Sequence, residues 1–201
     1  PATNPTSPDL KDASMMLVSL EGVDLFVGVG GGFNADKTAI DTSSAIGFNV
    51  SNANLELAIV KPKAPATPPA TPILTSYLGL ELTIDYAGLV GLESVPVIFE
   101  ATDLLVQVNS ATGPTGLAVD RLDWTTALDS NTGDLPGFAD GSTLVSTLEL
   151  KASGTVALDL VGFVLAQGNF TIVKRSVDVD VNGDGFLDPA TNPTSPDLKD
   201  A

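Results

Sequence analysis

The residues best suited to chemistry lie in one short segment near the C-terminus. Asp178–Asp188 reads DVDVNGDGFLD, with an oxygen-bearing side chain at every second position over its first half. From Asp180 onward it fits the pattern D-x-[DN]-x-[DN]-G, in which the loop curls so that oxygens at positions 1, 3 and 5 converge on one point. Gly185 stands at position 6, where a sharp turn is needed. This spacing predicts a calcium site.

The donors of this segment are oxygens, which a hard divalent cation prefers. At position 7 the donor would be a backbone carbonyl, and the carboxylate at position 9 would bind directly or through water. The predicted ligands are Asp178, Asp180, Asn182, Asp184, Phe186 and Asp188, and Asp197 and Asp200 are further candidates. An ion-free Asn-Gly or Asp-Gly turn is the alternative. We favour calcium, because these donors repel one another without a cation.

Over about a dozen residues the segment resembles the calcium loops of EF-hands, dockerins and thrombospondin type 3 repeats. It departs from them at position 12, where Thr191 replaces a bidentate glutamate, and Pro189 follows the loop at once. A helix–loop–helix is therefore not expected. The missing ligands would come from the flanking aspartates or from the next domain.

Composition excludes several other kinds of site. The chain has 201 residues, with 9 Lys and Arg against 25 Asp and Glu, which gives 9 − 25 = −16. The absence of His and Cys excludes Ser–His–Asp triads, Cys–His dyads, disulfides and zinc sites built on thiolate or imidazole. The acidic balance argues against nucleic acid and anionic membranes as partners. No apolar run is long enough for membrane insertion. No leader follows Pro1, so we expect a processed product or a part of a longer protein.

The two ends of the chain carry the same sequence. Residues 1–13 and 189–201 both read PATNPTSPDLKDA, at an offset of 189 − 1 = 188 residues. A duplicated tag is the alternative, but the second copy runs on directly from the predicted calcium loop. We therefore expect one unit of a long tandem array, a class of protein that is typically extracellular. Calcium would then stiffen each junction.

Proline content and the repeat divide the chain into three parts. Residues 1–13 are predicted to be an extended linker, residues 14–175 an all-β repeat domain, and residues 176–201 a calcium-binding junction linker. Within the domain, Lys61–Pro72 and Asp129–Ser142 are rich in turn-forming residues and predict exposed loops.

Period-2 alternation predicts β-strands and recurs in a shared pattern. In three segments a short polar residue is followed by Leu and then by alternating apolar residues: Leu20–Val29, Val50–Ile59 and Phe99–Val108. A fourth segment, Leu150–Leu160, fits more loosely, because it has Gly154 and Thr155 in place of the polar residue and Leu. The polar residues Asp24, Asn54 and Asp103 are expected to mark turns or bulges by bonding their own backbone. Only residues 119–128 favour a helix. The fold class is all-β, either an elongated β-sandwich or a solenoid of stacked antiparallel strands.

Taken together, the long identical repeats, the lack of Cys, the excess Asp and the terminal GDG loop resemble the calcium-dependent (RTX-type) surface adhesins of bacteria. The segments Gly28–Phe33, Gln107–Gly113 and Gly162–Phe170 are similar to repeat units of such proteins. The resemblance implies secretion to the cell surface, calcium-dependent extension, and attachment or surface-layer roles.

Three functions compete at this level. The first is a calcium-stiffened structural or adhesive spacer, whose partners are neighbouring identical repeats, joined head to tail and able to assemble laterally into filaments. The second is a glycan- or ligand-binding module that stacks its ligand on Trp124, Tyr77 or Tyr86. The third is a hydrolase with paired carboxylates. We expect no enzyme, because the glutamates fall at outward positions of a solvated face: Glu21, Glu56, Glu81, Glu100 and Glu149.

Overall fold

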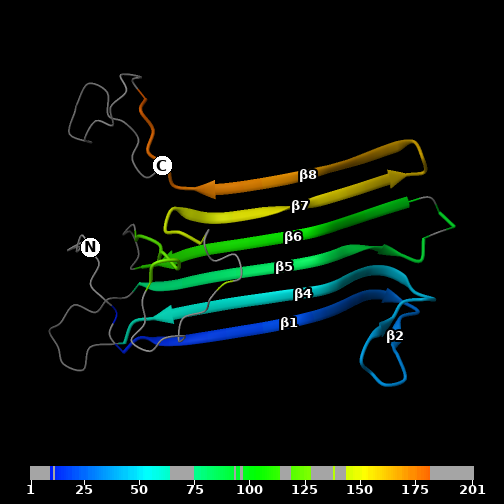
Figure 1. The fold of residues 1–201 in the computed structure, drawn as a ribbon, viewed down its shortest axis with the longest axis horizontal. Coiled ribbons are helices and arrows are strands. Elements are labelled where there is room, and N and C mark those ends of the chain that lie inside the picture. The colour runs from blue at the N-terminus through cyan, green and yellow to red at the C-terminus, as the bar shows by residue number, and fades with distance from the viewer. Residues whose placement is uncertain are drawn as a thin grey trace.

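The fold is one long antiparallel sheet (Figure 1). A computed structural model describes residues 10, 12–63, 75–92, 94–95, 97–113, 119–127, 138 and 144–181. Six strands pair in the order β1-β4-β5-β6-β7-β8, so neighbours in the sequence are neighbours in the sheet. Their bounds are β1 Ser14–Val29, β4 Ile46–Lys61, β5 Ser76–Val90, β6 Val97–Thr112, β7 Leu148–Leu160 and β8 Val164–Arg175. A small ribbon of β2 (Gly32–Phe33) and β3 (Ile40–Asp41) lies between β1 and β4 in the sequence.

The all-β prediction is confirmed, and no described residue is helical. The four segments with the shared alternating pattern lie within β1, β4, β6 and β7. The helix-like period at residues 119–128 does not produce a helix in the described residues 119–127. They hold a single turn that begins at Asp123, and the carboxylate of Asp123 accepts the backbone N–H of Thr125 at 3.0 Å. Most of the two predicted loops lies outside the described residues. The six long strands form one sheet and β2 and β3 a second, small one, and both the sandwich and the solenoid stay predictions.

Left-handed backbone residues cross the middle of the sheet. They are Gly22 on β1 (φ 62°), Asn52 on β4 (φ 53°) and Asp103 on β6 (φ 51°). The pairing of β1 with β4 and of β6 with β7 shifts register close to them. The sequence pattern predicts bulges near its polar residues, and Asp103 is both a pattern residue and a left-handed residue at a register shift. Residues of this kind cost little at φ near +55°, because Gly and Asn/Asp adopt that region most readily.

The first two pattern residues bond the neighbouring strand and not, as the sequence suggests, their own backbone. Asp24 accepts the backbone N–H of Asn52 at 3.0 Å, and Asn54 accepts the backbone N–H of Gly22 at 2.9 Å. The two bonds are reciprocal, so each strand supplies the side chain that satisfies the other strand's irregular backbone. An unpaired N–H would otherwise be left at each of these sites.

Regular pairing between Ser14 and this row of bulges gives the sheet two chemically different faces, since side chains alternate along a strand. One face, here called the polar face, carries the cross-strand row Ser19, Glu56, Glu81, Gln107 and Lys151. The other, the aliphatic face, carries the adjacent row Val18, Leu57, Leu80, Val108 and Leu150.

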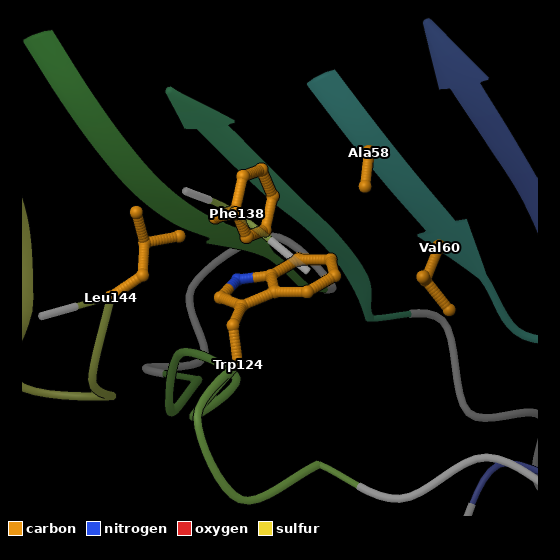
Figure 2. Packing of buried hydrophobic residues seen from close by; sticks show 5 residues of the cluster. All are labelled: Ala58, Val60, Trp124, Phe138 and Leu144. Atoms are coloured by element: carbon orange, nitrogen blue, oxygen red, sulfur yellow. The ribbon is translucent and has the colours of Figure 1, made fainter. Parts of the chain in front are cut away.

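The hydrophobic core lies on the polar face, at the end of the sheet where β1 begins. Figure 2 shows the Trp124 indole beside the Phe138 ring, with Ala58 and Val60 on β4 to one side and Leu144 to the other. The two rings meet edge to face with centroids 5.6 Å apart, an arrangement that aromatic pairs favour. The cluster covers only this end of the face.

A glycine makes room for the indole. A Cβ atom added at Gly79 on β5 would lie 2.7 Å from Cε2 of Trp124 and 2.9 Å from Cζ of Phe138. The rings therefore rest directly on the β5 backbone, and only a residue without a side chain fits beneath them.

We expect Gly79→Ala to lower the free energy of unfolding by about 1–3 kcal/mol, because the added methyl forces the buried rings to shift. Gly168→Ala is the matched control, since Gly168 also lies in a strand and a Cβ atom added there would meet nothing within 4 Å. Urea unfolding of both variants measures the difference. Equal stability of the two variants would contradict the close contact.

Candidate functional site

The predicted calcium segment leaves the sheet directly after β8, at an anchored point. Arg121 donates from Nη2 to the hydroxyl of Ser176 at 2.8 Å and from Nε to the carbonyl of Ser146 at 3.1 Å. Ser176 in turn donates its backbone N–H to the carbonyl of Thr147 at 2.9 Å. The guanidinium therefore ties three segments of the chain together with its fixed fork of donors. The chain is held in place two residues before Asp178.

Two of the predicted calcium ligands are described. Asp178 is exposed and Asp180 is half-buried, just beyond the end of β8. Both make interactions within the protein. The remaining predicted ligands lie outside the described residues: Asn182, Asp184, Phe186, Asp188, Asp197 and Asp200.

The donor chemistry of this segment fits calcium, since carboxylate, amide and carbonyl oxygens are the ligands that it takes. Within residues 144–181 and the other described ranges, no three His, Cys, Asp or Glu side chains gather in a group that could hold a metal. Any complete calcium shell would therefore need oxygens from the part of the motif that follows Val181.

The chain also enters the sheet at this end. Leu10 and Ala13, which precede β1, are half-buried against the Trp124 cluster. Asp12 lies between them, and its carboxylate is 3.5 Å from Nζ of Lys63 in an exposed ion pair, which contributes little. The last residues of the 13-residue repeat are thus part of the packed structure.

Sequence reasoning missed both anchors. Arg121 is one of only two arginines in the chain, and this scarcity was a usable signal, because a lone arginine with five donors often ties backbone carbonyls together. Leu10 is the only large apolar residue in the 13-residue repeat. Its isolation among polar residues could have indicated a docking contact.

The polar face holds the second group of chemically interesting residues. Gln107 is fully buried and its amide donates to the Glu81 carboxylate at 2.9 Å, while Glu81 is only 4% exposed. Glu56 lies directly opposite Glu81 on β4. Around these carboxylates is a shallow, open depression of about 350 Å³ lined by Ser19, Leu20, Glu21, Asn54, Leu55, Glu56, Glu81 and Thr83.

The glutamates differ from the predicted solvated face. The prediction is wrong for Glu81, which is buried beside Gln107. Partial burial raises the pKa of Glu56, and the charges of Glu81 and Glu21 raise it further. Glu149 behaves in the opposite way, because a hydrogen bond from Lys174 lowers its pKa. These are the electrostatic effects expected of a carboxylate row and of an exposed ion pair.

The aromatic residues considered for ligand stacking are partly used by the fold. Trp124 is 8% exposed, and its indole N–H donates to Oδ1 of Asn109 at 3.2 Å. A ring in that position has no free face for a sugar. Tyr77 is half-buried against the same cluster, and Tyr86 donates its hydroxyl to Glu100 at 3.4 Å.

Comparison with protein-family models, with curated proteins and with solved structures gave no match. Among the described residues, no helix is long and apolar enough to span a membrane.

We expect Glu56→Gln and Glu149→Gln to change stability in opposite directions at pH 7. The raised pKa of Glu56 means that its ionisation costs stability as the pH rises above 4.5, so removing the charge stabilises. The lowered pKa of Glu149 means that its ionised form adds stability above pH 4.5, so removing it destabilises.

Urea midpoints at pH 7 and pH 3 check both signs. As the pH falls to 3, Glu56 becomes protonated and the Glu56→Gln variant should approach the parent protein, whereas the lowered pKa of Glu149 delays the convergence of the Glu149→Gln variant to lower pH. A Glu56→Gln variant that is less stable than the parent at pH 7 would show that the Glu56 charge is not penalised.

Proposed function

We propose that this chain is a structural or adhesive repeat of a long extracellular tandem array, in which calcium stiffens the junction between units. The observation that carries the proposal is the identity of residues 1–13 and 189–201, directly preceded by the DVDVNGDGFLD segment. In an array every junction would then hold one calcium loop and one copy of the 13-residue sequence.

The contacts at the end of the sheet support a mechanical role for that loop. On one side Ser176 is held by Arg121. On the other side Leu10 packs against the Trp124 cluster, and Leu198 is its equivalent at the offset of 188 residues. In an array, Leu198 would dock on the next unit as Leu10 docks here. The calcium loop falls between these two anchors, where folding around an ion would fix the path of the chain.

The position of both anchors sets the direction of such an array. β1 begins and β8 ends at the same end of the sheet (Figure 1). In a tandem protein the junction linkers would therefore form the long axis, and each sheet would project sideways from that axis. This arrangement would leave the sheet edges available for lateral assembly into filaments. The resemblance to surface adhesins supports a location outside the cell.

A glycan- or ligand-binding module is the second candidate. The depression beside Glu56 and Glu81 favours it, since polar groups converge there in a concave surface. The burial of Trp124 weighs against it. A glycan array probed with the labelled protein separates the two functions, because a spacer binds no sugar.

We expect the chain to bind calcium with the junction motif, because its oxygens match the ligands that calcium takes. Titration calorimetry should show one site that is lost in the double variant Asp180→Ala and Asp184→Ala. The matched control removes two exposed acidic residues elsewhere, Asp36→Ala and Asp120→Ala, and should bind like the parent. Unchanged calcium binding in the Asp180 and Asp184 variant would show that the site is not in this motif.

A protein of two consecutive repeats tests the stiffening. Calcium should raise its melting temperature or its maximum dimension in small-angle X-ray scattering, and chelation should reverse the change. If the scattering curve and the melting temperature are the same with and without calcium, the junction is not a calcium-dependent stiffener.

A further inference from the structure

Three central rows of the aliphatic face consist of apolar side chains, except for Ser110 on β6 and Lys174 on β8. Besides the row through Leu80, a second row crosses all six strands beside it: Leu20, Leu55, Leu82, Val106, Ala152 and Ile172. A third row adds Met16, Ile59 and Leu78. Along each strand these positions alternate with the residues of the polar face, which is the pattern of a sheet that packs one face against an apolar partner.

The described part of the chain does not cover this face. On the polar face, Ala58 and Asn109 have no exposed surface, because the Trp124 cluster lies over them. On the aliphatic face no member of the three rows is buried; the central strands hold half-buried residues, and at the edges Met16 is 52% and Ile172 57% exposed. A contiguous apolar surface of this kind marks an interaction site.

Charge points to a second copy of the chain as the occupant. The net charge of −16 makes two copies repel one another wherever carboxylates meet. In this half of the sheet the acidic residues Glu56 and Glu81 lie on the polar face, and the three aliphatic rows contain no acidic residue. At the rim of the aliphatic face lie Lys61 and Lys174, and the ammonium of Lys174 bonds the carboxylate of Glu149 beside it. These three rows can therefore meet the same rows of a second copy without opposing carboxylates.

The area is sufficient for a stable contact. The apolar positions of β5 on this face run from Leu78 to Ile84 and span about 24 Å, and six strands at their usual spacing are about 24 Å wide, giving about 570 Å² in outline. Side chains that stand out from the sheet make the accessible area larger than the outline. A stable interface buries about 800 Å² on each partner. The face therefore falls in the range that a dimer needs.

We propose that two copies of this chain pack through their aliphatic faces into a two-layer β-sandwich. The sheets would lie about 10 Å apart, with the rows through Leu80 and Leu82 at the centre and the lysines at the rim. The sandwich considered from the sequence would then be made by two chains.

In the proposed tandem array, the neighbouring repeat would supply the second copy. This point alone rests on the proposed function, and the dimer itself does not. The junction of residues 176–201 spans up to about 80 Å when extended, which is longer than the sheet is wide. Tethering at that length raises the effective concentration of the second sheet to about the millimolar range.

Sedimentation equilibrium of the 201-residue chain tests the proposal. The expected mass at micromolar concentration is twice 20.5 kDa, both with calcium and with a chelator. Leu80→Glu at the centre of the face should return the mass to that of a monomer, and far-UV circular dichroism of the variant checks that the sheet is formed.

Two neighbouring residues of β8 provide matched variants that separate loss of the dimer from loss of the fold. Ile172 and Val173 are adjacent, β-branched and 57% and 49% exposed, and they lie on the aliphatic and the polar face respectively. Ile172→Glu should raise the dissociation constant at least tenfold, while Val173→Glu should leave it within twofold of the parent.

Three results would overturn the proposal. The first is a parent chain that remains monomeric at about 100 micromolar, a concentration at which only weak contacts stay dissociated. Equal effects of Ile172→Glu and Val173→Glu would indicate pairing through the sheet edges. Binding of the monomer to phosphatidylcholine vesicles, abolished by Leu80→Glu, would assign the face to lipid. Because dimerisation is measured without calcium, its failure leaves the calcium junction untouched, and loss of calcium binding leaves the dimer untouched.

Discussion

One buried amide holds together the end of the sheet on which the rest of the structure depends. Asn109 has no exposed surface, and its side chain makes three bonds: it accepts from the Trp124 indole and donates to the carbonyls of Leu122 and Val145. A buried side-chain amide is costly unless it is satisfied, and here the backbone of two loop segments satisfies it. The amide thereby fixes the indole above Gly79 and brings Arg121 close to the end of β8. Both the segment that precedes β1 and the segment that follows β8 are held by contacts to this arrangement.

The sheet separates two kinds of surface that a strongly acidic chain must keep apart. Carboxylates gather on the polar face, where Gln107 bonds Glu81 and where burial and neighbouring charges raise the pKa of Glu56. The three aliphatic rows of the opposite face contain no acidic side chain. Separation of this kind follows from the period of two along each strand, since a shift of one residue would exchange the faces. The row of left-handed residues at Gly22, Asn52 and Asp103 marks the point where this simple alternation is interrupted.

Alternation in the sequence was enough to predict four of the six long strands but not their surroundings. It placed β1, β4, β6 and β7, because their apolar residues recur at every second position. β5 lacks the Asp-Leu pattern and was not singled out, although it alternates as clearly. Alternation also assigned Glu81 to a solvated face, because it shows which side chains share a face and not what lies over that face. The Trp124 cluster comes from loop segments, whose contacts depend on long-range packing and leave no periodic signal. Of the calcium motif, the oxygen spacing is evident from sequence, and Asp178 and Asp180 are the predicted ligands that the structure describes.

The shared location of the two anchors also determines how a unit would respond to force. If an array were pulled, tension would act on the start of β1 and on the end of β8, which lie at one end of the sheet and on its two opposite edges. The load would then fall on the ladder hydrogen bonds of each edge strand one after another, since these bonds run perpendicular to the strands. Such a sheet peels strand by strand at low force and does not shear as a block. A surface fibre built from it would lengthen under load and absorb a shock before any junction broke.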